Sequence, residues 1–133
     1  MNLKKQMTMK KILFICTIML FAIGTLSAQK KAVISTAIAR HDFGEIKEAD
    51  GKVSHTFIIK NEGNMPLVLT RVIASCGCTT SEWPKAPLAP GKTAPVKITY
   101  DPKGRPGPFV KTISIYSNGK SGSFILTIRG QVI

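Results

Sequence analysis

The sequence predicts an all-β fold on two observations. Apolar and polar side chains alternate in one run after another, and this period of two is typical of half-buried strands. Glycine, proline and asparagine separate the runs, and outside residues 1–28 no segment of ten or more residues has the helical period of 3.6. We therefore expect strands and turns throughout the body of the chain.

The first 28 residues differ from the rest and predict a signal peptide. Four lysines precede an uncharged apolar run at residues 12–26, and the small pair Ser27 and Ala28 follows. The run has 15 residues, whereas a membrane-spanning helix needs about 20. We expect cleavage between Ala28 and Gln29, export to the periplasm or cell surface, and no transmembrane span in the mature chain.

The expected mature chain, residues 29–133, has the length of one domain and is basic. Its 105 residues suffice for a single core. The signal removes four of the 19 basic residues and none of the seven acidic ones, which leaves a formal charge of +8. The basic residues are scattered, and no nucleic-acid-binding motif accompanies them, so we expect no nucleic-acid partner.

Seven segments predict strands, in chain order: residues 32–46, 53–61, 66–75, 79–84, 94–101, 110–117 and 123–133. In the third segment the alternation changes phase, which predicts a β-bulge near Thr70 and Arg71. The inward phases of the strands predict a core made of the following residues: Phe57, Ile59, Leu67, Leu69, Val96, Ile98, Ile113, Ile115, Leu126 and Ile128.

Asn118 and Gly119 predict a two-residue hairpin turn between the last two strands, because both tolerate a positive φ. About seven short strands in about 100 residues are the proportions of an immunoglobulin-like β-sandwich. We expect such a sandwich at residues 29–133, preceded by the signal peptide at residues 1–28.

An ordered set of motifs resembles a known family. The motifs are HDFGEI (41–46), FIIKNEGNMPLVL (57–69), SCGCTT (75–80), PLAPGKT (87–93), ITYDP (98–102), GPFVKTISIYSN (107–118) and LTIRGQV (126–132). Together they resemble the bacterial domain-of-unknown-function 1573 family over residues 32–133. The resemblance implies an exported immunoglobulin-like sandwich, similar to the Hydin-like domains of ciliary and centrosomal proteins. It implies no biochemical activity, and only analogy of fold suggests scaffolding or binding. It also implies that Asn61 and Gly63 form a turn with an Asx-type hydrogen bond and a positive φ.

Cys76 and Cys78 flank Gly77 and are the cysteines that remain when Cys16 leaves with the signal. In a straight strand their α-carbons would lie about 6.6 Å apart, at the upper edge of the range of about 4.4–6.8 Å that a disulfide tolerates. Gly77 can adopt backbone angles that draw the sulfurs together. We expect a Cys76–Cys78 disulfide that is structural first. The alternatives are a copper(I) site or a thiol–disulfide redox pair formed by the same cysteines.

The remaining chemically active side chains predict structural roles. His55 shares a strand phase with Phe57 and is expected at the rim of the core, and Trp83 is expected to pack there as well. Four carboxylates are expected in a solvated connector: Asp42, Glu45, Glu48 and Asp50. No nucleophile elbow or phosphate-binding loop occurs. The expectation is a protein without catalytic residues, metal or cofactor, which binds an envelope protein or glycan or has a structural role in the cell envelope.

Overall fold

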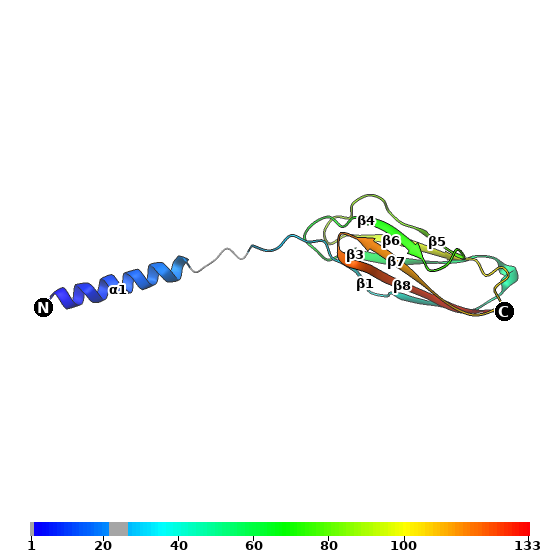
Figure 1. The fold of residues 1–133 in the computed structure, drawn as a ribbon, viewed down its shortest axis with the longest axis horizontal. Helices are drawn as coiled ribbons and strands as arrows, with labels where there is room; N and C mark the ends of the chain where they lie inside the picture. Colours follow the sequence, from blue (N-terminus) through cyan, green and yellow to red (C-terminus); the bar gives the residue numbers. More distant parts are fainter. Residues whose placement is uncertain (1, 22–26) are drawn as a thin grey trace.

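The computed structural model describes residues 2–21 and 27–133. The first of these ranges is a helix, α1 (Asn2–Phe21) (Figure 1). The end of the apolar run expected in a signal peptide, residues 22–26, lies outside the described residues. Within the described ranges, no helix has both the length and the apolar character needed to cross a membrane.

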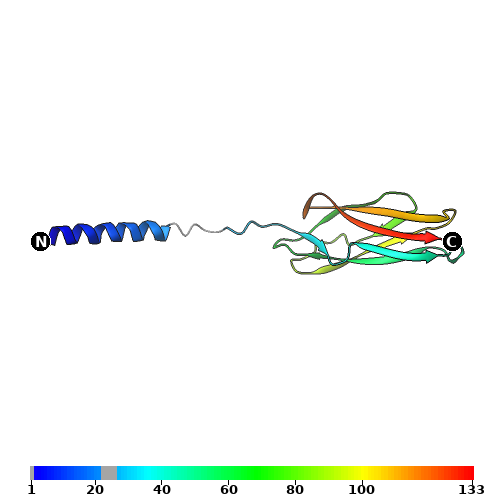
Figure 2. The same ribbon diagram turned by 90° about the horizontal axis from the view of Figure 1, so that it is seen from below.

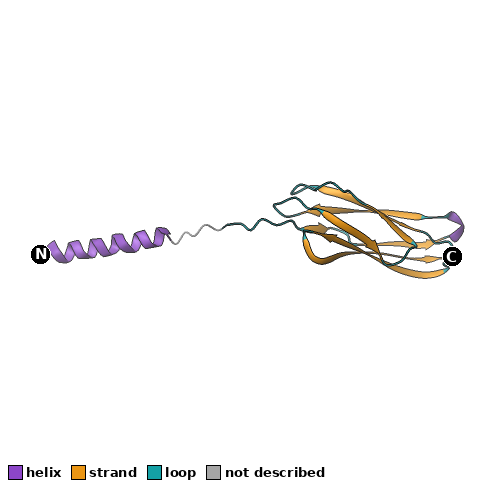
Figure 3. Ribbon diagram, turned by 45° about the horizontal axis from the view of Figure 1, so that its top comes forward, coloured by secondary structure: helices purple, strands orange, loops and turns teal. Residues whose placement is uncertain are grey.

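The body of the protein consists of strands arranged in two four-stranded sheets (Figures 2 and 3). The first sheet has the order β1 (Ile34–Thr36), β3 (Val53–Asn61), β6 (Thr93–Tyr100), β5 (Thr79–Glu82). The second has the order β2 (Arg40–Ile46), β8 (Lys120–Val132), β7 (Gly107–Ser117), β4 (Leu69–Ala74). Neighbouring strands are antiparallel except for β2 and β8, which are parallel. A short 3₁₀ helix, η1 (Glu48–Asp50), joins β2 to β3.

The mostly β architecture is confirmed, with eight strands in the described residues instead of about seven. The extra strand arises at residues 32–46, which the sequence presents as one segment and the structure divides into β1 and β2. The two halves join different sheets, because the chain crosses between sheets at residues 37–39. The hydroxyl of Thr36, at the end of β1, donates to the carbonyl oxygen of Ile58 in β3 at 2.8 Å, and the Ile38 carbonyl oxygen of the crossing lies 3.2 Å from the same hydroxyl.

A single hydrophobic core lies between the sheets. All ten predicted core residues are buried, and Tyr100, Phe109 and Val132 extend the cluster. Each fully buried side chain of this kind contributes about 1.5–3 kcal/mol through the hydrophobic effect, so alternation determines which face of each strand turns inward. The predicted bulge is also confirmed, because the β4–β7 register shifts between Leu69 and Arg71.

At the carboxyl end of β3, the side chain of Asn61 is fully buried and joins three segments of the chain. Its Oδ1 accepts hydrogen bonds from the backbone N–H groups of Gly63 at 3.0 Å and Val33 at 3.4 Å. Its Nδ2 donates to the carbonyl oxygens of Met65 at 2.8 Å and Leu88 at 2.9 Å. We call this cluster the Asn61 junction. The expected Asx-type hydrogen bond is therefore present, within a larger network.

Two glycines near this junction have a different role from the one predicted. Positive φ was expected at Gly63 and at the turn of Asn118 and Gly119, and none of the three has it. Glycine is needed at residues 63 and 119 because neighbouring atoms leave no room for a Cβ atom. A Cβ on Gly63 would lie 2.2 Å from the carbonyl oxygen of Lys31, and one on Gly119 would lie 2.6 Å from Cδ1 of Leu67. The close approach of distant segments thus excludes a side chain at both positions.

Candidate functional site

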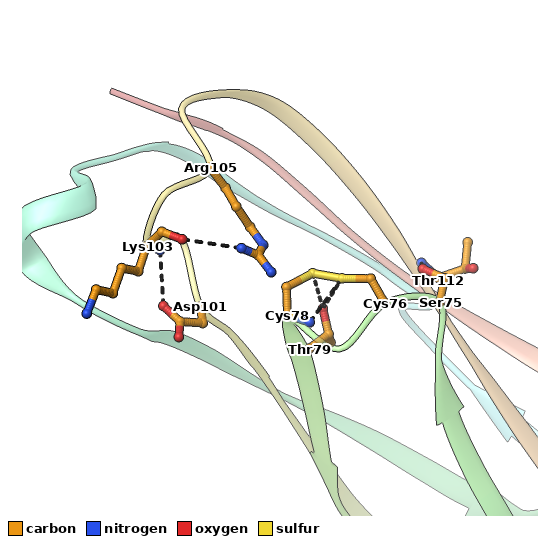
Figure 4. Close-up of a disulfide and its surroundings, with 8 residues drawn as sticks. All are labelled: Ser75, Cys76, Cys78, Thr79, Asp101, Lys103, Arg105 and Thr112. Atoms are coloured by element: carbon orange, nitrogen blue, oxygen red, sulfur yellow. Dashed lines mark hydrogen bonds between the residues drawn. A yellow bond between two sulfur atoms is a disulfide. The ribbon is translucent and has the colours of Figure 1, made fainter.

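The two cysteines lie in the turn between β4 and β5, where the chain passes from one sheet to the other. A disulfide joins Cys76 to Cys78, and their α-carbons are 5.3 Å apart (Figure 4). That separation is inside the range of about 4.4–6.8 Å that disulfides tolerate. We call residues 75–79 the cysteine turn.

Gly77 does not contribute to the bridge in the way the sequence suggested. Its φ is not positive, and an added Cβ would meet no atom within 4 Å. The α-carbons approach because residues 76–79 form a β-turn, closed by a hydrogen bond from the backbone N–H of Thr79 to the carbonyl oxygen of Cys76 at 3.3 Å. The expectation of glycine-specific backbone angles at residue 77 is therefore wrong.

Hydrogen bonds that do not involve the sulfurs hold the cysteine turn on both sides. Before the cysteines, the Ser75 backbone N–H donates to the Thr112 carbonyl oxygen at 2.9 Å, and the Thr112 N–H donates to Ser75 Oγ at 3.1 Å. After them, the Asp101 N–H donates to the Cys78 carbonyl oxygen at 2.9 Å. The backbone of the turn is thus anchored to β7 and to the end of β6 independently of the bridge.

The two sulfur-bearing residues have unequal environments. Cys78 is 4% exposed and belongs to the hydrophobic core, whereas Cys76 is only half-buried. The backbone N–H of Cys78 donates to Sγ of Cys76 at 3.2 Å. The hydroxyl of Thr79 lies 3.7 Å from Sγ of Cys78 and 4.0 Å from Sγ of Cys76. Cys76 therefore combines the greater access to solvent with a direct N–H donor.

A basic loop between β6 and β7 lies beside the bridge. In Figure 4 the Arg105 guanidinium points toward the disulfide, and its Nη1 donates to the carbonyl oxygen of Lys103 at 3.3 Å. The Lys103 N–H donates to the Asp101 carboxylate at 3.0 Å, which shapes the loop. Burial raises the pKa of the Tyr100 hydroxyl, and the charge of Arg105 opposes that rise.

The copper(I) alternative concerns the same two sulfurs. Copper(I) would need the two sulfurs as thiolates, and in the disulfide they are not available as such. Within residues 2–21 and 27–133, no three or more His, Cys, Asp or Glu side chains are grouped so as to hold a metal ion.

The two histidines form a stacked pair between the sheets. The rings of His41 in β2 and His55 in β3 are 3.7 Å apart and nearly parallel, at 8°. Each ring also meets a phenylalanine edge-on, Phe43 for His41 and Phe57 for His55. Burial lowers the pKa of His55, and the neighbouring His41 lowers it further. His55 is half-buried on the phase of Phe57, as predicted for the rim of the core.

The four carboxylates lie in β2 and η1, not in the predicted loop: Asp42, Glu45, Glu48 and Asp50. They are exposed. Asp42 accepts hydrogen bonds from the Gly44 backbone N–H at 2.8 Å and from Arg129 Nε at 2.7 Å, and these bonds lower its pKa. Glu48 accepts from the Gly104 N–H at 2.6 Å. These contacts give both carboxylates structural partners. Trp83 packs against the core, as predicted, with Lys85 over its ring.

The ordered motifs and the two-sheet architecture can be compared with known proteins. A family model described as "Protein of unknown function (DUF1573)" matches residues 34–132. The chain belongs to the DUF1573 family. The match covers the eight strands described above and the cysteine turn, so the resemblance seen in the sequence is confirmed. No curated protein matches this DUF1573 chain.

Solved structures share the fold of this DUF1573 chain at low sequence identity. A protein of unknown function from Porphyromonas gingivalis W83 is similar with a TM-score of 0.66 and 20% identity over 82% of this chain. This chain spans half of the length of that protein, 50%. The secreted serine protease VesC from Vibrio cholerae is similar with a TM-score of 0.55 and 16% identity, over 78% of this chain and 23% of its own. The Vibrio cholerae VesB protease has a TM-score of 0.51 and 20% identity, over 77% of this chain and 31% of its own. At these identities the likeness concerns the fold alone.

Proposed function

We propose that this chain is an exported, immunoglobulin-like binding module of the cell envelope, and that it binds a protein through the outer face of the β2-β8-β7-β4 sheet. In this proposal the module has no catalytic residues and no cofactor. The observation that carries it is a pair of exposed isoleucines on that face, one on each side of a serine, flanked by a tyrosine and by arginines.

The strand order supports the immunoglobulin-like part of the proposal. Immunoglobulin domains place strands A, B, E and D in one sheet and C, F and G in the other. Matching β1 to A, β3 to B, β4 to C, β5 to D, β6 to E, β7 to F and β8 to G reproduces both orders. In this assignment β2 continues strand A into the second sheet, beside β8.

Export is supported by the N-terminal pattern and by the disulfide. Lysines followed by an apolar run and small residues are typical of a secretory signal, here residues 1–28. Disulfides persist in oxidising compartments such as the periplasm and are rare in the cytosol. The proposed mature domain is residues 29–133, and we expect the intact mass of exported protein to correspond to a chain that begins at Gln29. Full-length chain held in the inner membrane would contradict this.

The exposed row runs across three neighbouring strands. Ile73 of β4 pairs with Ser114 of β7, and Ser114 pairs with Ile125 of β8. The two isoleucines point outward and are 46% and 43% exposed. In the next row, Tyr116 carries the Arg71 guanidinium 4.4 Å above its ring. Tyrosine and arginine with adjacent aliphatic surface are typical of the centres of protein interfaces.

The charge of this face indicates the chemistry of the partner. Arg40, Arg71 and Arg129 are exposed on it, and the carboxylate of Asp42 is paired with Arg129. A protein that presents an apolar patch bordered by carboxylates would complement this surface. A glycan is less well matched, because Arg71 covers the tyrosine ring on which a sugar would stack.

Site-specific cross-linking tests the proposal with a matched control. A photo-activated amino acid would replace Ile73 or Ile125 in the full chain, and Ile58 would be replaced as the control. Ile58 is 51% exposed and lies in β3, in the other sheet. We expect positions 73 and 125 to cross-link to the same protein in cells, and position 58 not to. Equal products from all three positions would contradict the proposal. Binding to purified envelope polysaccharide that Ile73→Asp abolishes would show that the partner is a glycan instead.

A further inference from the structure

The Cys76–Cys78 bridge is poorly suited to be a structural staple. A disulfide stabilises mainly by restricting the unfolded chain, and this effect is smallest for the shortest loops. Here a single residue separates the two cysteines. The backbone of the turn is already held by the contacts of Ser75 with Thr112 and of Asp101 with Cys78. Opening the bridge therefore leaves the main anchors of the turn in place.

The two sulfurs are arranged as an attacked sulfur and a leaving sulfur. Cys76 is half-buried at the edge of the core and Cys78 is buried within it, so an incoming thiolate would meet Cys76 first. In the reduced protein, the Cys78 N–H, 3.2 Å from Sγ of Cys76, would stabilise a Cys76 thiolate. In Figure 4 the guanidinium of Arg105 points toward the bridge from the Cys78 side, where its positive charge would stabilise Cys78 as the leaving sulfur. The hydroxyl of Thr79 is placed to donate to the Cys78 sulfur at 3.7 Å.

We propose that Cys76–Gly77–Cys78 is a reversible thiol–disulfide exchange site whose substrates are dithiols, with Cys76 as the exchanging sulfur and Arg105 as a positioning residue. This inference is independent of the binding face proposed above. It assigns the two cysteines chemically different roles, which a structural bridge would not need.

The exchange proceeds through two successive attacks of sulfur on sulfur. One thiolate of the dithiol attacks Sγ of Cys76, the Cys76–Cys78 bond breaks, and its electron pair leaves on Cys78, which takes up a proton. The second sulfur of the dithiol then attacks the first, which releases Cys76 as a thiolate. The dithiol is oxidised to a disulfide, the protein disulfide is reduced to two thiols, and two protons pass from the dithiol to the cysteines. A disulfide substrate reverses the sequence, with the Cys76 thiolate as the attacking group.

The first test is reversible reduction of the folded protein. Cys16 is a free, exposed cysteine, so every sample would be the full chain with Cys16→Ser. The protein would be equilibrated with reduced and oxidised dithiothreitol, alkylated, and weighed by mass spectrometry. We expect both cysteines to become reduced while circular dichroism keeps its native β signal, and oxidised dithiothreitol to restore the bridge. Reduction that occurs only together with loss of the native signal would overturn the proposal.

The second test separates the roles of the two sulfurs. Cys78→Ala leaves Cys76 alone, and Cys76→Ala leaves Cys78 alone. We expect Cys76 to react with the aromatic disulfide dithionitrobenzoate at least about tenfold faster than Cys78, because reaction follows access and thiolate character. Equal rates, or a faster Cys78, would overturn the assignment of roles.

Charge variants that keep both Cys76 and Cys78 test Arg105. Arg105→Gln should slow the reduction of the bridge by dithiothreitol, because the leaving Cys78 sulfur loses a stabilising charge, and Arg105→Lys should restore the rate. Lys60→Gln is the matched control, since Lys60 pairs with Thr93 at the opposite end of the first sheet. If Lys60→Gln changed the rate as much as Arg105→Gln does, Arg105 would have no specific role in the exchange. One copper(I) ion bound per reduced chain, in a form that blocks alkylation of both cysteines, would assign the site to metal binding instead.

Discussion

The Asn61 junction and the cysteine turn lie at opposite ends of β6. The first is held by buried hydrogen bonds, and the second contains a partly exposed disulfide. Asn61 bonds to Lys92, just before β6 begins, and Cys78 bonds to Asp101, just after it ends. At the junction a fully buried amide makes four side-chain hydrogen bonds, and glycines let segments approach closely. At the turn a half-buried sulfur belongs to a bridge that spans only one residue. A covalent bond therefore need not mark the end of the molecule that stabilises the fold.

The largest effect should come from Asn61→Ala. The change removes the four hydrogen bonds of a buried amide, at about 1 kcal/mol net each, so we expect a loss of about 3–5 kcal/mol in the free energy of unfolding. Urea unfolding followed by circular dichroism measures it. Asn64→Ala is the control, because Asn64 is exposed and bonds to Lys31 at 2.7 Å. The control should lose about 1 kcal/mol. Equal losses of unfolding free energy in the two variants would show that the Asn61 junction stabilises the fold no more than an exposed hydrogen bond does.

Two glycine-to-alanine changes sharpen the comparison. Gly63→Ala places a Cβ against the carbonyl oxygen of Lys31, and overpacking of this kind costs about 1–3 kcal/mol. Gly77→Ala meets open space and needs no positive φ, so its effect should stay within about 0.5 kcal/mol. The same unfolding titration ranks them. A larger loss of unfolding free energy in Gly77→Ala than in Gly63→Ala would show that the cysteine turn tolerates a side chain less well than the Asn61 junction, which is the opposite of what we expect.

Reducing the Cys76–Cys78 bridge should have a modest effect on stability. For a three-residue loop the chain-entropy relation gives about 1.6 kcal/mol, against about 3 kcal/mol for a loop of 15 residues. Unfolding of the Cys16→Ser chain with and without dithiothreitol gives the difference. A loss above about 3 kcal/mol would mean that the turn stabilises the fold as strongly as the junction.

The sequence predicted the core more completely than the two ends. Alternation identified the inward faces because the apolar residues of each strand are the ones that are buried. The bounds of β3 are also those expected from the sequence. The boundary between β1 and β2 was missed because it depends on which sheet each half joins. The roles of Gly63 and Gly119 were missed for a similar reason, since the atoms they approach belong to segments distant in sequence.

At the cysteine turn, the sequence identified the two cysteines, and the structure shows that they differ in burial and in their neighbours. The spacing of Cys76 and Cys78 suggested a bridge, a redox pair or a metal site without ranking the sulfurs. Burial of Cys78 by the core and the approach of the 101–106 loop arise only when the sheets assemble. The outward row of Ile73 and Ile125 likewise depends on the strand register across β7.

The smallest effect concerns the histidine pair, which belongs to neither end. The pKa of His55 is lowered in the folded protein from its usual value of 6.5. The unfolded chain therefore binds the proton more readily, so stability should fall as the pH drops from about 6.5 toward the folded pKa. Thermal unfolding at about pH 7.5 and about pH 5.5 should show a lower Tm at the acidic pH. His55→Gln should reduce that difference. A Tm that rises on acidification would contradict the direction of the shift.

The most direct test of the account measures how fast dithiothreitol reduces the bridge as urea is added below the unfolding transition. If the Asn61 junction and core hold the fold while the cysteine turn exchanges, reduction occurs from the native state. Its rate should then be proportional to the thiol concentration and nearly independent of urea. A rate that rises exponentially with urea, in parallel with global unfolding, would show that the bridge is inaccessible in the folded protein and would contradict the account.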